Sequence, residues 1–323
     1  MRREGGAGRR PCVVAVPKNT ADRHVAQIEA VDPRVRVVRV ADRKTWLREA
    51  PEAEVILGFR PLRDAARESQ HLRWVHALGA GVENLCQDVA GTEILVTNNH
   101  IHADAIADHV FAFLLTHTRR MRDAHESQTA RHWVHTELVG TILAGQTMGV
   151  LGLGTIGRGV ARRAAAFGMR VVGTKRRPEP IPGVAEVRPP EDTDGVLRQS
   201  AVLVISLPLT PATRRIVGAR ELALLPEGAF VVNIGRGGLV DEDALLAALR
   251  SGRLGGAGFD VFEQEPLPTD SPLWDAPRLI ITPHVSGDFP GYLDRMVPIF
   301  CENLERYLAG QPLLNVVDQA LGY

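Results

Sequence analysis

A glycine-rich string in the middle of the sequence has the spacing of a phosphate-binding turn. A GxGxxG pattern follows an apolar run, Met148–Leu151, and opens a helix-compatible segment, Ile156–Phe167. Glycine permits the tight turn, lets a pyrophosphate approach the backbone and lets the helix lie close to the strand. The helix N-terminus then offers N–H groups and a partial positive charge to the phosphates. The competing interpretation is a glycine turn without a ligand. The predicted dinucleotide contacts are Gly152, Gly154, Thr155, Ile156 and Gly157.

The residues after the next predicted strand indicate which dinucleotide binds. An NAD site has an Asp or Glu at this point, about 20 residues after the glycines, that binds the ribose 2′-hydroxyl. Here Arg170–Gly173 is followed by three cations before the first carboxylate, Glu179. Cations favour a 2′-phosphate, so we expect NADP(H) as the preferred cofactor and NAD(H) as the alternative. A solvated basic loop that tolerates either cofactor is the competing interpretation. The cations are Lys175, Arg176 and Arg177.

Three further strings follow the glycine turn in a fixed order: Asn233–Asp241, Phe259–Leu267 and Thr282–Gly287. With the glycine turn they resemble the D-isomer-specific 2-hydroxyacid dehydrogenases, the group of glyoxylate/hydroxypyruvate reductases, phosphoglycerate dehydrogenases and D-lactate dehydrogenases. The resemblance extends over nearly the whole chain after its first ten residues and is strongest from Thr147 to Gly287. It implies hydride transfer between NAD(P)H and a small 2-oxo acid, which gives a D-2-hydroxy acid.

The resemblance also implies a catalytic set of Arg236, Glu265 and His284. Hydride transfer to a carbonyl leaves negative charge on its oxygen, and a histidine with a near-neutral pKa suits the proton donor. A carboxylate beside the imidazole orients it and stabilises its charged form. An arginine anchors the substrate carboxylate and polarises the carbonyl with a two-pronged donor. Taken singly, each residue also fits a purely structural position in a turn or loop.

Weaker matches add further cofactor and substrate contacts. Asp260 resembles the residue that binds the nicotinamide amide. The string from Leu78 to Asn84 resembles a substrate loop whose successive N–H groups hold a carboxylate, although it could also be a tight glycine turn. The remaining predicted cofactor contacts are Leu207, Pro208, Ile234 and Gly235, and the predicted substrate contacts are Leu78, Gly79, Ala80, Gly81, Arg236 and His284.

These residues require an α/β framework to position them. Short apolar runs such as Val13–Val16 and Val35–Val40 alternate with charged, helix-compatible segments, which indicates parallel sheets covered on both faces. In the stretch Ala103–Arg120, apolar residues recur at helical spacing, and another helix is expected over about Tyr292–Leu308. The further predicted strands are Val55–Leu57, Trp74–Leu78, Ile94–Val96, Thr147–Leu151, Ala201–Ile205, Ala229–Ile234, Gly256–Asp260 and Leu279–Ile281.

We therefore predict two α/β domains, Rossmann-like and flavodoxin-like, each with a parallel sheet, and an active-site cleft between them. Residues 1–10 are expected to be a disordered tail. Residues 11–102 with 291–323 are predicted to form the substrate domain, and residues 103–290 the dinucleotide-binding domain.

Composition limits the classes of partner and location. The 323-residue chain has a formal net charge of zero, and a nucleic-acid or anionic-membrane partner would usually require a basic surplus. No apolar run approaches the ~20 residues of a membrane span. Cys12, Cys86 and Cys301 lack the spacing of a metal knuckle or CxxC motif, so no metal is expected and a reducing, cytoplasmic location fits best. The resemblance implies a homodimer, in which Trp133 could reach the partner's pocket.

Other functions remain open at this point. Formate dehydrogenases share the implied fold but have glutamine in place of the acid that partners the histidine, so Glu265 argues against them. Phosphite dehydrogenases retain the same three catalytic residue types. A dinucleotide-sensing corepressor, which binds partners without turnover, would need the cofactor site alone.

Overall fold

The computed structural model describes residues 10–322, which form two compact units. Unit 1 consists of residues 10–101 and 289–322, and unit 2 consists of residues 102–288. Of the tail expected over residues 1–10, residues 1–9 lie outside the described part. Arg10 is described, and its guanidinium contacts the ring of His71 at 2.9 Å.

Unit 1 is built on a five-stranded parallel sheet in the order β2-β1-β3-β4-β5. One face of the sheet packs against α2, α3 and α4, and the other packs against α1 and α11. The strands are β1 (Cys12–Pro17), β2 (Val35–Val40), β3 (Ala53–Leu57), β4 (Trp74–His76) and β5 (Leu95–Thr97), and the helices are α1 (Asp22–Glu29), α2 (Trp46–Glu49), α3 (Arg63–Glu68), α4 (Glu83–Asp88) and α11 (Tyr292–Leu308).

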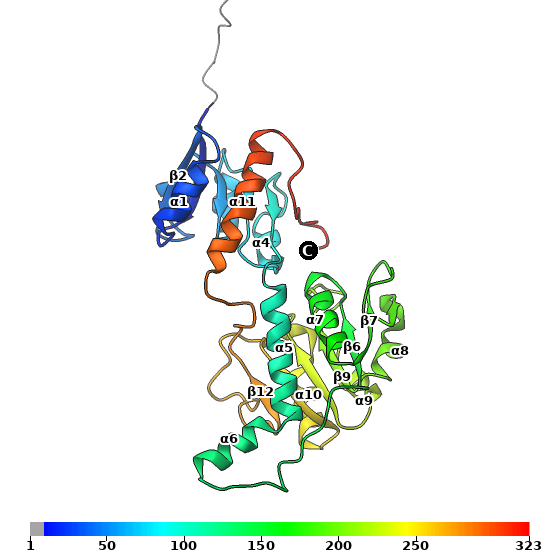
Figure 1. The fold of residues 1–323 in the computed structure, drawn as a ribbon. Helices are drawn as coiled ribbons and strands as arrows, with labels where there is room; N and C mark the ends of the chain where they lie inside the picture. Colours follow the sequence, from blue (N-terminus) through cyan, green and yellow to red (C-terminus); the bar gives the residue numbers. More distant parts are fainter. Residues whose placement is uncertain (1–9, 323) are drawn as a thin grey trace, which may run out of the picture. The chain divides into compact units, whose positions relative to one another are not determined.

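Helix α11 returns to unit 1 from the far end of the sequence. Figure 1 shows α11 lying beside α1, and the apolar side of α11 covers the strands. Phe300 stacks on Trp74 with ring centroids 5.0 Å apart, and Asp294 accepts a hydrogen bond from buried His24 at 2.8 Å. The helix therefore completes the core of a sheet whose strands lie some 200 residues earlier in the chain.

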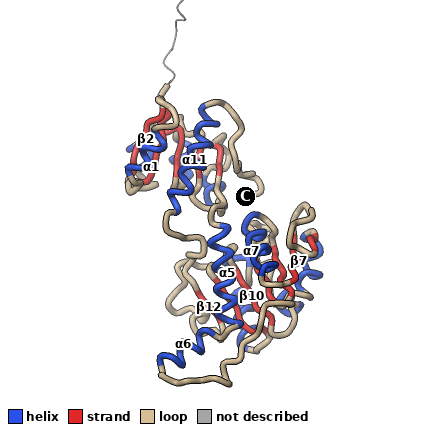
Figure 2. The backbone as a smooth tube through the Cα atoms, in the orientation of Figure 1, coloured by secondary structure: helices blue, strands red, loops and turns tan. Residues whose placement is uncertain are grey.

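Unit 2 is built on a seven-stranded parallel sheet in the order β12-β11-β10-β9-β6-β7-β8. Helices α5 and α7 cover one face (Figure 2). Helices α8, α9 and α10 cover the other face. The strands are β6 (Thr147–Leu151), β7 (Arg170–Thr174), β8 (Glu186–Arg188), β9 (Val202–Ile205), β10 (Ala229–Asn233), β11 (Leu254–Phe259) and β12 (Leu279–Ile281); the helices are α5 (Ala103–Thr118), α6 (Met121–Thr129), α7 (Thr155–Ala166), α8 (Thr193–Leu197), α9 (Ala219–Leu224) and α10 (Glu242–Arg250), with short 3-10 turns η1 (Pro190–Asp192) and η2 (Gly237–Leu239).

The two parallel sheets confirm the predicted fold class. Unit 2 reverses strand order between β6 and β9, because the chain runs outward through β7 and β8 before it crosses to β9. In open α/β sheets, ligands bind at the carboxyl ends of the strands at such a switch point. The glycine turn directly follows β6, and the strings with Arg236, Asp260 and His284 follow β10, β11 and β12. The carboxyl end of the sheet in unit 2 therefore carries most of the predicted site.

Candidate active site

The glycine turn has two glycines that the fold requires and one that leaves space. Gly152 has φ +98°, and a Cβ there would lie 2.4 Å from the Ser206 carbonyl oxygen. A Cβ on Gly157 would lie 2.1 Å from the Gly152 carbonyl oxygen, so this glycine allows α7 to lie against the turn. A Cβ on Gly154 would meet no atom within 4 Å. The open side of Gly154, at the start of α7, fits a pyrophosphate on the helix N-terminus.

Other predicted cofactor residues lie close to this turn. The Leu207 side chain would be 3.1 Å from a Cβ on Gly152, and a Cβ on Gly235 would be 2.8 Å from the Leu207 carbonyl oxygen. The Pro208 carbonyl accepts a hydrogen bond from the Thr213 hydroxyl at 2.7 Å, which fixes the loop after β9. Segments that follow β6, β9 and β10 thus meet at one edge, as a bound dinucleotide would require.

The basic loop after β7 contains its own carboxylate partner. Glu179 Oε1 lies 3.0 Å from Lys175 Nζ and 2.7 Å from a guanidinium nitrogen of Arg158. The hydrogen bond and charge of Lys175, with Arg158, lower the pKa of Glu179. Arg176 and Arg177 are exposed beyond them. Thr174, by contrast, is buried, and its hydroxyl accepts a hydrogen bond from the Gly152 N–H at 3.3 Å.

Arg236 lies in a turn held by hydrogen bonds directly after β10. The Asn233 side chain accepts from the Gly235 N–H at 3.1 Å and donates to the Arg236 carbonyl at 3.0 Å. A Cβ on Gly237 would be 1.8 Å from the Phe262 carbonyl carbon, so the turn packs against the loop that carries Glu265. The strings with Arg236 and Glu265 are therefore brought together.

Glu265 and His284 form a direct pair. Nδ1 of His284 lies 2.7 Å from Oε2 of Glu265, while Oε1 of Glu265 accepts the Phe262 N–H at 2.9 Å. The carboxylate can only accept, so Nδ1 carries a proton and proton exchange with a substrate falls to Nε2. The side chains of His284 and Glu265 are 50% and 36% exposed. This geometry suits a proton donor whose ring is oriented by a carboxylate.

A hydrogen-bond network next to His284 joins the predicted Asp260 to two residues that the sequence did not single out, Thr282 and His109. Asp260 is fully buried, and its carboxylate accepts hydrogen bonds from the Thr282 hydroxyl and from the N–H groups of Val285 and Ser286. The Thr282 hydroxyl also contacts Nε2 of His109 on α5 at 3.0 Å. The available signal was a histidine beside the apolar residues Ile106, Val110 and Phe113 of α5, where a histidine is also consistent with a core position.

The predicted substrate loop lies in unit 1, whereas the glycine turn and catalytic set lie in unit 2. Strand β4 ends at His76, two residues earlier than expected, so Leu78 already belongs to the loop. The loop's carbonyl groups are held by side chains: Asn98 donates to Ala80 at 2.9 Å, and Asn99 and the Tyr292 hydroxyl both donate to Leu78. These side chains fix the carbonyl groups of Leu78 and Ala80, and an anion would bind to the N–H groups of such a loop.

Within residues 10–322, no group of three or more His, Cys, Asp and Glu side chains is arranged to hold a metal ion. Nor does any helix in that range have the length and apolarity needed to cross a membrane.

The chain resembles known proteins over most of its length. Residues 111–286 match the family model for the D-isomer specific 2-hydroxyacid dehydrogenase, NAD binding domain. The D-3-phosphoglycerate dehydrogenase of Methanocaldococcus jannaschii is 31% identical over 290 residues, which are 88% of this chain and 55% of that protein. The chain therefore spans about half the length of that relative. Glyoxylate/hydroxypyruvate reductase B of Pectobacterium carotovorum subsp. carotovorum is 35% identical over 265 residues, which are 79% of this chain and 82% of that protein.

A solved structure is similar over nearly the full chain. The NADPH-dependent glyoxylate/hydroxypyruvate reductase of Sinorhizobium meliloti, in complex with NADP and sulfate, matches with a TM-score of 0.84 and 29% sequence identity. The match covers 97% of this chain and 100% of that one.

Proposed function

The chain belongs to the D-isomer specific 2-hydroxyacid dehydrogenase family, as the sequence resemblance predicted, and we propose that it reduces a small 2-oxo acid such as glyoxylate or hydroxypyruvate to the D-2-hydroxy acid. Membership implies a nicotinamide dinucleotide cofactor. The observation that carries the proposal is the pair of Glu265 and His284. The pair lies at the carboxyl end of the sheet in unit 2, where Arg236 and the glycine turn also lie. The relatives do not favour the phosphite dehydrogenase or corepressor alternatives.

Each catalytic residue has a distinct role in this proposal. The reduced nicotinamide, when bound, supplies the hydride for the carbonyl carbon. His284 donates the proton from Nε2 to the carbonyl oxygen, and Glu265 holds the ring by its Nδ1. Arg236 binds the substrate carboxylate and polarises the carbonyl. Residues 78–81 remain the proposed substrate loop, which would offer backbone N–H groups to a carboxylate. Asp260 remains the proposed partner of the nicotinamide amide.

We propose NADP(H) as the preferred cofactor. Lys175, Arg176 and Arg177 follow β7 at the position where an NAD enzyme has its ribose-binding acid. The structure of the similar Sinorhizobium meliloti enzyme contains NADP, which supports the same choice here. Residues 103–290 would form the dinucleotide-binding domain, with residues 11–102 and 291–323 as the substrate domain. The match of residues 111–286 to the NAD binding domain supports that division.

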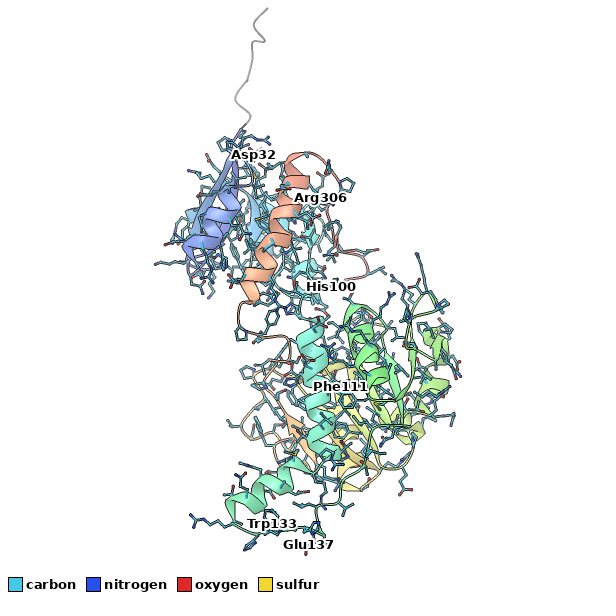
Figure 3. The ribbon with its side chains drawn as sticks, viewed as in Figure 1. Asp32, His100, Phe111, Trp133, Glu137 and Arg306 are labelled. Atoms are coloured by element: carbon cyan, nitrogen blue, oxygen red, sulfur yellow. The ribbon has the colours of Figure 1, made fainter. Side chains whose placement is uncertain are left out.

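We further propose a cytoplasmic homodimer. Trp133 is 98% exposed on the long loop after α6 (Figure 3). Val139 and Ile142 on the same loop are also exposed. Exposed apolar side chains on one loop are typical of a surface that a partner covers. The free, buried cysteines fit a reducing compartment. Sedimentation at micromolar concentration should show a dimer, and Trp133→Ala should weaken it; a wild-type monomer would contradict the assembly.

Turnover assays test the activity. We expect oxidation of NADPH, and more slowly of NADH, with glyoxylate, hydroxypyruvate, pyruvate or phenylpyruvate, with phosphite oxidation as the control reaction. His284→Ala should lower kcat by about 10²–10⁴-fold, the usual contribution of a general acid, with little change in NADPH affinity. His71→Ala in unit 1 is the matched control. No turnover with any 2-oxo acid, or full turnover in His284→Ala, would overturn the proposal.

A further inference from the structure

The backbone at His284 is strained, and something must hold it. His284 has φ +56°, in the left-handed region that residues other than glycine rarely adopt. Such a conformation persists only where the surrounding structure fixes it. His284 is half exposed, so packing of its own side chain does not supply the restraint. Glu265 holds the ring through Nδ1, and the residues on either side of His284 hold its backbone.

We propose that His109 and Thr282 are positioning residues, which act through the buried carboxylate of Asp260 to hold the loop that presents His284. We call the three side chains His109, Thr282 and Asp260 the clamp. The inference rests on the proposed function, because it assigns the clamp to the residue that would donate the proton.

The clamp begins at the ends of two paired strands. Phe259 on β11 pairs with Ile281 on β12, so Asp260 and Thr282 are the next residues along adjacent strands. The Thr282 N–H donates to the Phe259 carbonyl at 3.0 Å, which continues the ladder by one step. The Thr282 hydroxyl then donates to Oδ1 of Asp260 at 2.6 Å. The two side chains are thus locked together at the point where the loop begins.

Asp260 fixes the far side of His284. Its Oδ1 accepts the Val285 N–H at 2.9 Å, and its Oδ2 accepts the Ser286 N–H at 3.0 Å. His284 is therefore enclosed between Thr282, whose carbonyl accepts the His284 N–H at 3.1 Å, and two residues tied to a fully buried carboxylate. A buried carboxylate with three donors is stable, whereas loss of one donor leaves an underbonded charge.

The number of protons available to Thr282 determines whether His109 donates or accepts its hydrogen bond. A hydroxyl has one proton, and Thr282 gives it to Asp260, which can only accept. The 3.0 Å contact between Thr282 Oγ1 and His109 Nε2 must then be donated by the imidazole. The His109 ring is held edge-on against Phe113, with centroids 4.7 Å apart and an interplanar angle of 88°. Helix α5 therefore fixes the direction of the Thr282 hydroxyl.

Paired substitutions at Thr282 test the clamp. Thr282→Val keeps the shape and loses the hydroxyl, whereas Thr282→Ser keeps the hydroxyl. We expect kcat to fall about 10- to 100-fold in Thr282→Val, as for a small displacement of a catalytic group, and to stay within about 3-fold of wild type in Thr282→Ser. KM and NADPH affinity should change much less than kcat. His109→Gln, which retains a donor, should keep more activity than His109→Leu.

Amide hydrogen exchange gives a second readout that does not depend on activity. In Thr282→Val and His109→Leu, the amides of Val285 and Ser286 should exchange at least about 5-fold faster, while amides within β10 keep wild-type rates. Equal losses in Thr282→Ser and Thr282→Val, or unchanged kcat and exchange in both Thr282→Val and His109→Leu, would overturn the clamp. If Thr282→Val does not fold, the two His109 variants decide. Faster exchange in a protein whose wild type reduces no 2-oxo acid would reject the proposed function and keep the clamp.

Discussion

The pair of Glu265 and His284 acts by orientation rather than by burial. Both side chains are partly exposed, and an ion pair in such a setting contributes only about 0–1 kcal/mol. What the pair provides is direction: one carboxylate oxygen is tied to the Phe262 backbone and the other to Nδ1 of His284. The imidazole therefore cannot rotate freely, and Nε2 keeps one orientation.

Arg236 allows a test of geometry against charge. Its proposed grip needs two parallel donors, which a lysine ammonium cannot supply. We expect Arg236→Lys and Arg236→Ala both to lower kcat/KM on the order of 10²-fold or more with a 2-oxo acid. Arg250→Lys, on the exposed side of α10, is the matched control and should have wild-type kinetics. Near-normal kcat/KM in Arg236→Lys would show that charge alone is sufficient.

At the scale of elements, the proposed preference for NADP(H) would depend on a competition between anions in the loop after β7. Glu179 already occupies Lys175 and Arg158, so a 2′-phosphate has to displace its carboxylate or share these cations with it. This contact would moderate the proposed preference that three cations alone would give.

Removal of the Glu179 charge should therefore strengthen binding of a 2′-phosphate. We expect Glu179→Gln to bind 2′,5′-ADP roughly 3- to 10-fold more tightly than wild type, with 5′-AMP unaffected, because one partly solvated charge has an effect of this size. Lys175→Ala should have the opposite effect, and Glu191→Gln is the control. Calorimetry measures all four proteins. Equal affinities of Glu179→Gln and wild type for 2′,5′-ADP would show that Glu179 does not compete.

Element type was predictable from the sequence wherever an element buries a full face. The helix expected over Ala103–Arg120 is α5, and its buried Val110 and Leu114 are the residues whose spacing predicted it. Strand β8 was missed because it has three residues, all half-buried, at the edge of the sheet. The sequence of β8, Glu186-Val187-Arg188, has no apolar run, because a strand at the edge of a sheet is buried less fully than a central strand.

The site was predictable only where local strings carry it. The glycine turn and the strings after β10, β11 and β12 could be recognised in the sequence. The residues that form each of these turns are close together in the chain, so their spacing is a local pattern. The clamp could not, because His109 and Thr282 are 173 residues apart and meet only through the packing of α5. No local pattern distinguishes His109 from a histidine buried for packing alone.

At the scale of the whole molecule, stability should depend on pH through a histidine in unit 1. Burial lowers the pKa of His76 from 6.5 to about 4, and the residue is fully buried beside Trp74. The unfolded chain takes up a proton near pH 6.5, whereas the folded chain does so only near pH 4. Stability is therefore lost as the pH falls between these values, by up to about 3 kcal/mol.

Urea unfolding, followed through the buried Trp46 and Trp74 of unit 1, checks this dependence. We expect the free energy of unfolding to be about 2–3 kcal/mol lower at pH 4.5 than at pH 7 from this group, and His76→Gln to remove most of that difference. His71→Gln should leave it unchanged. A His76→Gln protein with the wild-type pH dependence would assign the effect to other groups.

The return of α11 to unit 1 has a consequence for biosynthesis. Unit 2 is contiguous, so all of its strands have left the ribosome once residue 288 is free, and domains generally fold as units during synthesis. The strands of unit 1 are made first, yet only α1 can cover the face that holds Trp74 until Phe300 and Leu304 emerge. The later unit should therefore mature before the earlier one, and the nascent chain carries a partly uncovered apolar sheet face for most of its translation, which makes it a client for chaperones that bind such faces.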